Sequence, residues 1–396
     1  MTACWIWLAA RPGLGPVKLR ELLERFGSPR ELYAADEAAL ERMGLNERTR
    51  RALADKDLRR AHAILQDCNI RQITVLTLGD EAYPSALRQT ADAPLVLYCR
   101  GRLPAGPGPR IGVVGARQAD ERGLTAARRI SREIAGCGGV VVTGMAKGVD
   151  AEAARGALEA GGAVVGVLGG GVDVVYPAEN AALFARVEEQ GCLLSEYPPG
   201  TTPNARHFPA RNRIISALSD GVVVVQAAEH SGALITARWA ADQGRDVFSV
   251  PGPAGDALCR GSNQLLRDGA ILAECGWDVM REYLYRYPGA VREYHCEQAP
   301  VLPAPPAEQP AGRQAAPKVK ASAAPDKPAE RPAPKPLPAE LTPLQRRVLD
   351  ALEAGPLQLD ALIGRLDLPA AQVLPQLTLL QIKGLITQKP GKIYER

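Results

Sequence analysis

Two glycine-containing segments carry residue types that bind anions. The first, VVGAR, contains Gly115 and Arg117, and the second, TGMAKGVD, contains Gly144, Lys147 and Gly148. A glycine lets the backbone approach a bound anion, and the free N–H groups at the start of a helix attract negative charge. Arginine adds a planar fork that holds two phosphate oxygens, and lysine adds a point charge. These segments therefore predict phosphate contacts, with tight turns that bind no ligand as the alternative.

Cations and an aromatic residue gather in the segment RHFPARNR, which supplies Arg206, Phe208, Arg211, Asn212 and Arg213. Guanidinium groups hold phosphates while a ring stacks on an unpaired base, and a site for single-stranded nucleic acid needs both. The segment therefore favours such a site. The alternative is that Phe208 belongs to the core and that the arginines pair with carboxylates.

A further anion site is predicted at Ser231 and Gly232, which open the segment SGALITAR at an expected helix start. The sequence has neither GxxxxGK[ST] nor a GxGxxG that follows a strand with an acidic residue further on, so no nucleotide cofactor is expected. The eight cysteines form no CxxC pair, so no metal is expected. The net charge of +4 is small, and a polyanion site must therefore come from a local cluster.

Short apolar runs alternate with helical patterns through the centre of the chain. Strands are predicted over 110–114, 140–143, 163–168, 192–195, 221–226 and 246–250, and helices over 121–135, 148–160, 180–189, 211–218 and 233–243. This alternation is typical of a parallel sheet covered on both faces, and we expect an α/β, doubly wound, Rossmann-like fold. Ligands bind such sheets beyond the carboxyl ends of the strands, where the glycine-containing segments fall.

The chain is predicted to have four parts: a helical domain over 1–75, a Rossmann-like domain over 76–296, a disordered linker over 297–339 that is rich in proline and alanine, and a winged-helix domain over 340–396.

The first part is expected to form helices over 16–26, 28–34, 37–43 and 47–67. Its turns at Gly13 and Gly44 are similar to those of helix-hairpin-helix modules, whose backbone amides touch DNA, and a small packing domain is the alternative.

In the last part, the helix expected over 370–383 has one cation, at its end. An auxiliary or protein-contact role is therefore favoured over reading of the major groove.

The order and spacing of seven motifs resemble the DNA-processing protein A (Smf) family: VGARQ, TGMAKGVD, LGGGVDVVYP, SEYPPG, FPARNRIIS, SGALITAR and VPG. The resemblance covers roughly residues 80–280. Family members often have arginine where this chain has Lys147, which keeps the charge but loses the fork.

The resemblance implies a protein that binds single-stranded DNA, protects incoming DNA during natural transformation and helps load the RecA recombinase. It implies a groove lined by Arg117, Lys147, Phe208 and residues 211–213, and a homodimer formed through the Rossmann-like domains. Leu265, Leu266, Ile271 and Leu272 are the candidate dimer face, and a simple buried helix is the alternative there.

Two other function classes compete with this interpretation. The first is a nucleotide phosphoribohydrolase, an enzyme class that carries a motif resembling PGGxGTxxE. The nearest stretch of this chain, SGALITA, has no glutamate at the position of the motif's glutamate. With no evident nucleophile and base pair we expect no enzyme, although Asp150 and Glu196 would be the carboxylates to test. A transcription regulator acting through 340–396 is the other alternative. No window approaches the ~18 apolar residues of a membrane span, so we expect a cytoplasmic protein.

Overall fold

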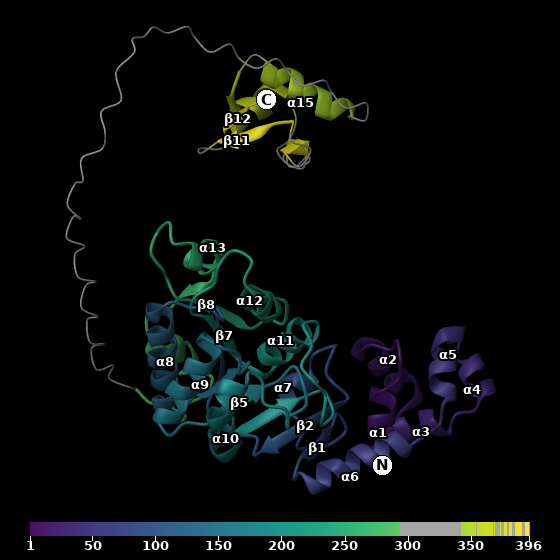
Figure 1. Cartoon of the computed structure of the whole chain (residues 1–396). Coiled ribbons are helices and arrows are strands. Elements are labelled where there is room, and N and C mark those ends of the chain that lie inside the picture. Colours follow the sequence, from purple (N-terminus) through teal and green to yellow (C-terminus); the bar gives the residue numbers. More distant parts are fainter. Residues whose placement is uncertain are drawn as a thin grey trace, which may run out of the picture. The chain divides into compact units, whose positions relative to one another are not determined.

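The computed structural model describes residues 1–293, 342–353, 355–366, 368, 373, 376, 377, 380, 381, 385–389 and 393–395. The chain forms two compact units, residues 1–304 and 305–396 (Figure 1). The linker predicted over 297–339 lies outside the described residues. Among the described helices, none has both the length and the apolar character that crossing a bilayer requires.

The first unit begins with short helices: α1 (Thr2–Ala9), α2 (Pro16–Phe26), α3 (Pro29–Ala34), α4 (Glu37–Arg42), α5 (Glu47–Ala54) and α6 (Arg59–Ile70). The prediction of a single helix over 47–67 is wrong, because the helix is interrupted between the end of α5 and the start of α6. There Asp55 accepts a hydrogen bond from the amide of Asp57, and Asp57 accepts one from the amide of Arg59. Such local bonds give the backbone an alternative to the helix.

A nine-stranded sheet follows, with the order β1-β2-β6-β5-β4-β3-β7-β8-β9. Its strands are β1 (Thr74–Thr77), β2 (Val96–Gly101), β3 (Arg110–Val114), β4 (Val140–Thr143), β5 (Val164–Val167), β6 (Cys192–Ser195), β7 (Gly221–Val224), β8 (Asp246–Ser249) and β9 (Ile271–Leu272). Pairing is parallel from β6 to β9 and antiparallel at β1–β2 and β2–β6. Strands β1 and β2 are not among those predicted from the sequence, and the domain boundary predicted after residue 75 falls inside β1.

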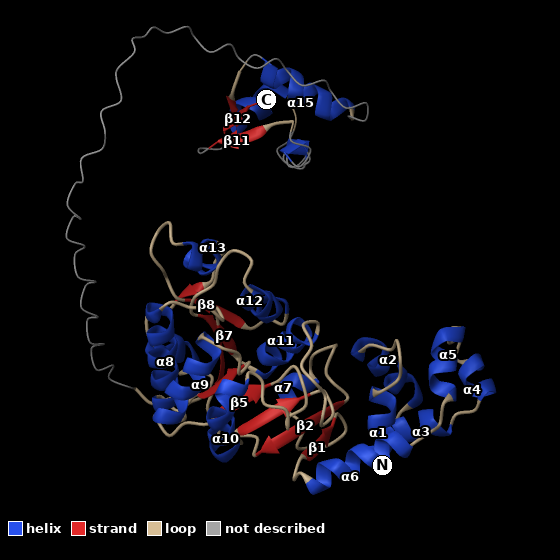
Figure 2. Ribbon diagram, in the orientation of Figure 1, coloured by secondary structure: helices blue, strands red, loops and turns tan. Residues whose placement is uncertain are grey.

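Helices cover both faces of this sheet (Figure 2). One face packs against α8 (Glu121–Gly136), α9 (Val149–Glu159), α10 (Ala181–Gln190) and α14 (Gly276–Met280). The other packs against α7 (Ser85–Arg88), α11 (His207–Leu218) and α12 (Gly232–Asp242). Every residue of β4, β5, β6 and β7 is buried. The predicted doubly wound α/β fold is thus confirmed.

Shorter elements connect these layers: the 3-10 helices η1 (Ala178–Asn180), η2 (Ala257–Cys259) and η3 (Arg281–Tyr283), and the helix α13 (Arg260–Arg267). The parallel strand order runs in opposite directions on the two sides of β3, with β4 on one side and β7 on the other. The loops that follow β3 and β7 therefore diverge and leave a crevice at the carboxyl edge.

The second unit contains α15 (Pro343–Glu353), β10 (Leu357–Gln358), α16 (Leu359–Leu366), β11 (Thr387–Lys389) and β12 (Ile393–Glu395). The strands form a sheet in the order β10-β12-β11, and Val348, Leu362 and Leu377 lie in a small core. The helix predicted over 370–383 falls largely outside the described residues. Helices followed by two wing strands agree with the predicted winged helix.

Candidate nucleic-acid interface

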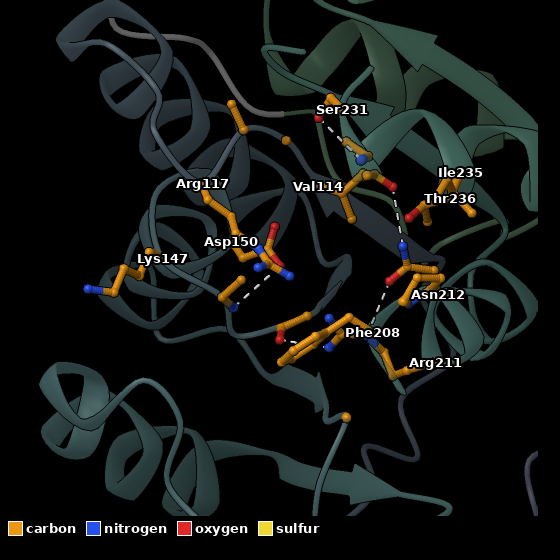
Figure 3. A pocket seen from close by; sticks show the side chains of 18 of the residues that line it. Val114, Arg117, Lys147, Asp150, Phe208, Arg211, Asn212, Ser231, Ile235 and Thr236 are labelled. Atoms are coloured by element: carbon orange, nitrogen blue, oxygen red, sulfur yellow. Dashed lines mark hydrogen bonds between the residues drawn. The ribbon is translucent and has the colours of Figure 1, made fainter. Parts of the chain in front are cut away.

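A pocket of about 1300 Å³ opens at the carboxyl edge of the sheet (Figure 3). Loops after β3, β4, β5 and β7 form its walls, together with the first turns of α11 and α12. Most of the residues predicted to bind nucleic acid line it: Gly115, Arg117, Gly144, Lys147, Phe208, Arg211, Asn212, Ser231 and Gly232. Gly148, Arg206 and Arg213 do not.

Two glycines allow the loops after β3 and β4 to touch. Gly148 has a φ of +75°, and a Cβ added there would lie 2.4 Å from the carbonyl oxygen of Ala116. A Cβ added at Gly115 would lie 2.7 Å from the side chain of Val149. Since real Cβ atoms do not approach so closely, both glycines serve loop packing, and Gly148 has this role from outside the pocket lining.

Arg211 lies at the floor of the pocket and is only 3% exposed. Its Nη1 donates hydrogen bonds to the carbonyl oxygens of Gly144, at 2.7 Å, and Val167, and its Nε donates to Oδ1 of Asn212 at 3.2 Å. Burial lowers the pKa of Arg211 to about 10. The sequence predicts that Arg211 lines the DNA groove; in the structure Arg211 lines the pocket, and its guanidinium joins α11 to the strand ends below it.

Asp150 lies beside Arg211 and is 6% exposed. Its Oδ2 accepts a hydrogen bond from the amide of Ala146 at 3.4 Å. Burial raises the pKa of this carboxyl above its ordinary value, against the opposing effect of the nearby Arg211 charge. The floor of the pocket thus contains one buried cation and one buried acid.

The rim has a different chemistry. The Arg117 guanidinium lies over the ring of Phe208, with 4.8 Å between its central carbon and the ring centroid. Phe208 is half-buried and packs against Tyr176 in a tilted arrangement, with 5.8 Å between the ring centroids and 34° between the ring planes. A Cβ at Gly169 would lie 3.1 Å from the Phe208 ring, so the loop after β5 supports this ring from below. Phe208 is therefore a rim residue and not a core residue.

Two further predicted cations are exposed. Lys147 extends away from the centre of the pocket (Figure 3), and its Nζ lies 2.6 Å from Oε2 of Glu179. Arg206 precedes α11, and the neighbouring His207 ring stacks on Tyr197 at 4.0 Å. Because a surface ion pair is weak, Lys147 is available to a phosphate that displaces Glu179.

Arg213 corrects the sequence prediction. Its side chain is 9% exposed, and its guanidinium pairs with Asp92 at 3.3 Å and with Glu196 at 2.7 Å, outside the pocket lining. The alternative that an arginine pairs with carboxylates therefore holds at this position. Glu196, one of the carboxylates considered for an enzyme, is held in the same cluster.

The start of α12 forms the opposite wall. The Ser231 hydroxyl accepts a hydrogen bond from the amide of Ala233 at 3.3 Å, and Asn212 donates to the carbonyl oxygen of Gly232 at 3.3 Å. Sequence reasoning missed other residues that line the pocket, among them Tyr176, His230, Thr236 and Arg260. Tyr176 and His230 follow the ends of β5 and β7, so their place after strands was a usable signal.

The candidate dimer face lies apart from the pocket lining. Leu265 and Leu266 are half-buried on α13, whereas Ile271 and Leu272 form the edge strand β9. Leu272 is 49% exposed. The stretch is thus a helix followed by a strand, and not the single buried helix weighed as its alternative.

Comparison with known proteins identifies the family. The model of the DNA recombination-mediator protein A family matches residues 74–284, and that of the DprA winged helix domain matches 332–392. The chain is 32% identical to protein Smf of Synechocystis over all of its own length and 98% of that protein. It is 41% identical to DNA processing protein DprA of Streptococcus pneumoniae over 52% of this chain and 72% of that protein. A crystal structure of DprA from S. pneumoniae, 32% identical, superposes with a TM-score of 0.64 and covers 71% of this chain and 98% of its own. The chain belongs to the DNA-processing protein A (DprA/Smf) family of DNA recombination mediators.

Proposed function

We propose that this chain binds single-stranded DNA across the pocket at the carboxyl edge of its sheet. The observation that carries the proposal is the rim, where the guanidinium of the exposed Arg117 lies over the half-buried ring of Phe208. Arg117 holds a phosphate, and Phe208 with Tyr176 stacks an unpaired base. The amides at the start of α12 provide a second phosphate contact beside Gly232.

Single strands are favoured over duplex because the aromatic rings stand at the mouth of a concave site. A base can stack there only after it has left its partner. Among the residues that we assign to direct contact, Arg117, Lys147 and Arg206 carry the exposed charge. Gly148 positions the loops, Arg211 joins α11 to the strand ends at the floor of the pocket, and Arg213 stabilises the fold.

The protein works by binding and not by catalysis in this proposal. Glu196 is held by Arg213 outside the pocket lining, and Asp150 is held at the floor by the amides of Ala146 and Gly115, so we assign neither carboxyl a catalytic step. Binding protects incoming DNA in the cytoplasm during natural transformation and presents the strand to the RecA recombinase. Two copies associate through α13 and β9, so that the homodimer has two such pockets.

Direct binding tests the proposal. We would measure the affinity of a labelled strand of about 30 dT residues, and of a matched duplex, across a salt series. We expect preference for the single strand, and a fall of log K with log salt whose slope decreases by about 0.7 for each phosphate contact removed. Arg117→Ala should weaken binding and lower this slope.

Arg186→Ala is the matched control, because Arg186 is exposed on α10 outside the pocket lining. Equal weakening by both variants would reject the pocket as the site, and absent single-strand binding would reject the proposal. RecA loading is a separate arm, measured as the rate of RecA filament growth on the strand with and without the protein.

A further inference from the structure

The floor of the pocket presents a hydrogen-bond donor and an acceptor side by side. A Cβ added at Gly144 would lie 2.5 Å from Nη2 of Arg211 and 2.6 Å from Oδ2 of Asp150. Both atoms therefore lie beside the Cα atom of Gly144, on the side where another residue would carry its side chain. Both side chains line the pocket although each is more than nine-tenths buried.

Part of the bonding capacity of this pair is unused. Arg211 donates through Nη1 and Nε, and Nη2 has no hydrogen-bond partner among the residues that the structure describes. Asp150 accepts from the amide of Ala146 at 3.4 Å and from that of Gly115. A carboxylate has roughly four acceptor positions, so about two remain. Because both side chains line the pocket, these positions are open to a ligand that enters it.

The charge of the floor argues against a phosphate there. A carboxylate repels a phosphate oxygen, whereas the rim carries Arg117 and Lys147 with exposed side chains. Phosphates therefore stay at the rim. A neutral group that donates to Asp150 and accepts from Arg211 suits the floor, and the edge of a nucleobase is such a group.

We propose that Asp150 and Arg211 recognise the edge of one unstacked base and select guanine. This inference rests on the proposed binding of single-stranded DNA. Guanine offers two adjacent donors, N1–H and the N2 amine, to the two oxygens of the carboxylate, and its O6 accepts from the guanidinium. Thymine has one N–H donor, and adenine and cytosine each have one amine, so none of them makes a bidentate contact with Asp150.

A base panel tests this selection without any variant. The strands are dT oligomers of about 20 nucleotides with one central dT, dG or deoxyinosine, a length that fits one or two binding sites. Inosine keeps N1–H and O6 but lacks the 2-amino group. We expect the dG strand to bind about 10-fold more tightly than dT, as for a bidentate base contact, with inosine between them.

Asp150→Asn should bring the three affinities within about twofold of one another, because the amide replaces one acceptor oxygen by an NH₂ group, which opposes the second guanine donor. Asp220→Asn is the matched control. Asp220 is also largely buried, and its carboxylate accepts a hydrogen bond from the Tyr287 hydroxyl. It precedes the first residue of β7 and therefore lies at the opposite end of that strand from the pocket. The Asp220→Asn variant should have the base preference of the wild type, and melting curves should show that both variants fold.

The outcomes distinguish guanine selection from single-strand binding itself. Equal binding of dT, inosine and dG strands by the wild type would overturn guanine selection and leave single-strand binding intact. A preference that persists in Asp150→Asn would remove Asp150 from the contact. Failure to bind any of these strands would overturn the proposed function as well. If Asp150→Asn does not fold, the wild-type panel alone decides.

Discussion

The guanidinium of Arg211 donates a 2.7 Å hydrogen bond to the carbonyl oxygen of Gly144. These two residues are separated by 67 positions in the chain, and the bond holds the start of α11 against the loop after β4. A buried charged donor that lost this acceptor would be left unpaired, which is costly. The shape of the pocket floor therefore depends on a glycine and on an arginine that sequence alone would assign to the ligand.

Replacing Gly144 by alanine should destabilise the fold. The added Cβ would lie within 2.6 Å of Arg211 and Asp150, and both buried side chains are held by hydrogen bonds to the backbone. We expect the free energy of unfolding to fall by about 1–3 kcal/mol, as for overpacking in a core.

Urea unfolding would measure this change. Gly232→Ala is the matched control in the same pocket, because no atom lies within 4 Å of its added Cβ. This variant should keep its stability, and a loss equal to that of Gly144→Ala would contradict the steric explanation.

Arg213→Ala should affect stability and not base stacking. Its removal leaves Asp92 and Glu196 without their shared cation in a largely buried place. Breaking a buried pair from one side costs about 3–5 kcal/mol. The same substitution at exposed Arg117 should cost less than about 0.5 kcal/mol. Thermal melts of the two variants make the comparison, and a stable Arg213→Ala protein with impaired DNA binding would return this arginine to the interface.

The sequence predicts which residues gather in the pocket but not which of its arginines are buried. Gly115, Arg117 and Ser231 follow strand ends, and in a parallel sheet those ends meet at one edge, so their gathering in one pocket was predictable. The burial of Arg213 was not, because its partner Asp92 lies far away in the sequence. Arg211 and Arg213 are two positions apart and therefore face different sides of α11, one toward the pocket and one toward Glu196.

The missed strands have a similar cause. Strand β2 pairs with β1 and β6 in antiparallel fashion, and antiparallel pairs need no crossover helix. The alternation of strands and helices, from which the other strands are predicted, therefore does not extend to β2. The break between α5 and α6 depends on side chains of Asp55 and Asp57 that bond the backbone two residues onward. Helical periodicity does not report such bonds.

Glu179→Gln should strengthen binding of single strands. The Glu179 carboxylate holds Lys147 at 2.6 Å, and both side chains are more than half exposed. Its neutralisation frees the amine and removes a repulsive charge near the rim. We expect about twofold to fivefold tighter binding at low salt, an effect that disappears at high salt because exposed charges are screened. Lys147→Gln should act in the opposite direction, and unchanged affinity in both variants would exclude Lys147 from the contact.

The buried carboxyl of Asp150 should make stability depend on pH. Burial raises its pKa in the folded state above the ordinary value of 3.8. Below that value the group is neutral in both states and brings no penalty. As pH rises through the raised pKa, the folded chain must hold a buried charge while the unfolded chain holds a solvated one, so this part of the stability is lost.

The free energy of unfolding of Asp150→Asn, minus that of the wild type, should therefore increase as pH rises from about 4 to about 7. Urea unfolding at several pH values measures this difference. A difference that is constant across that range, or that decreases, would show that the carboxyl is not desolvated in the folded state.

Leu272→Lys should weaken self-association if the edge strand β9 joins two copies. Leu272 is 49% exposed at the end of the sheet order, where the strand has one free side. Desolvating a lysine at the centre of an apolar contact is unfavourable, and edge lysines oppose pairing of strands. We expect a dimer in sedimentation of the wild type and a shift of at least about 10-fold in its dissociation constant for the variant. Ile70→Lys is the control, since Ile70 is 71% exposed on α6 and lies outside this face. An equal shift for both variants would indicate general charge repulsion, and an unchanged dimer in Leu272→Lys would place the contact elsewhere on the molecule.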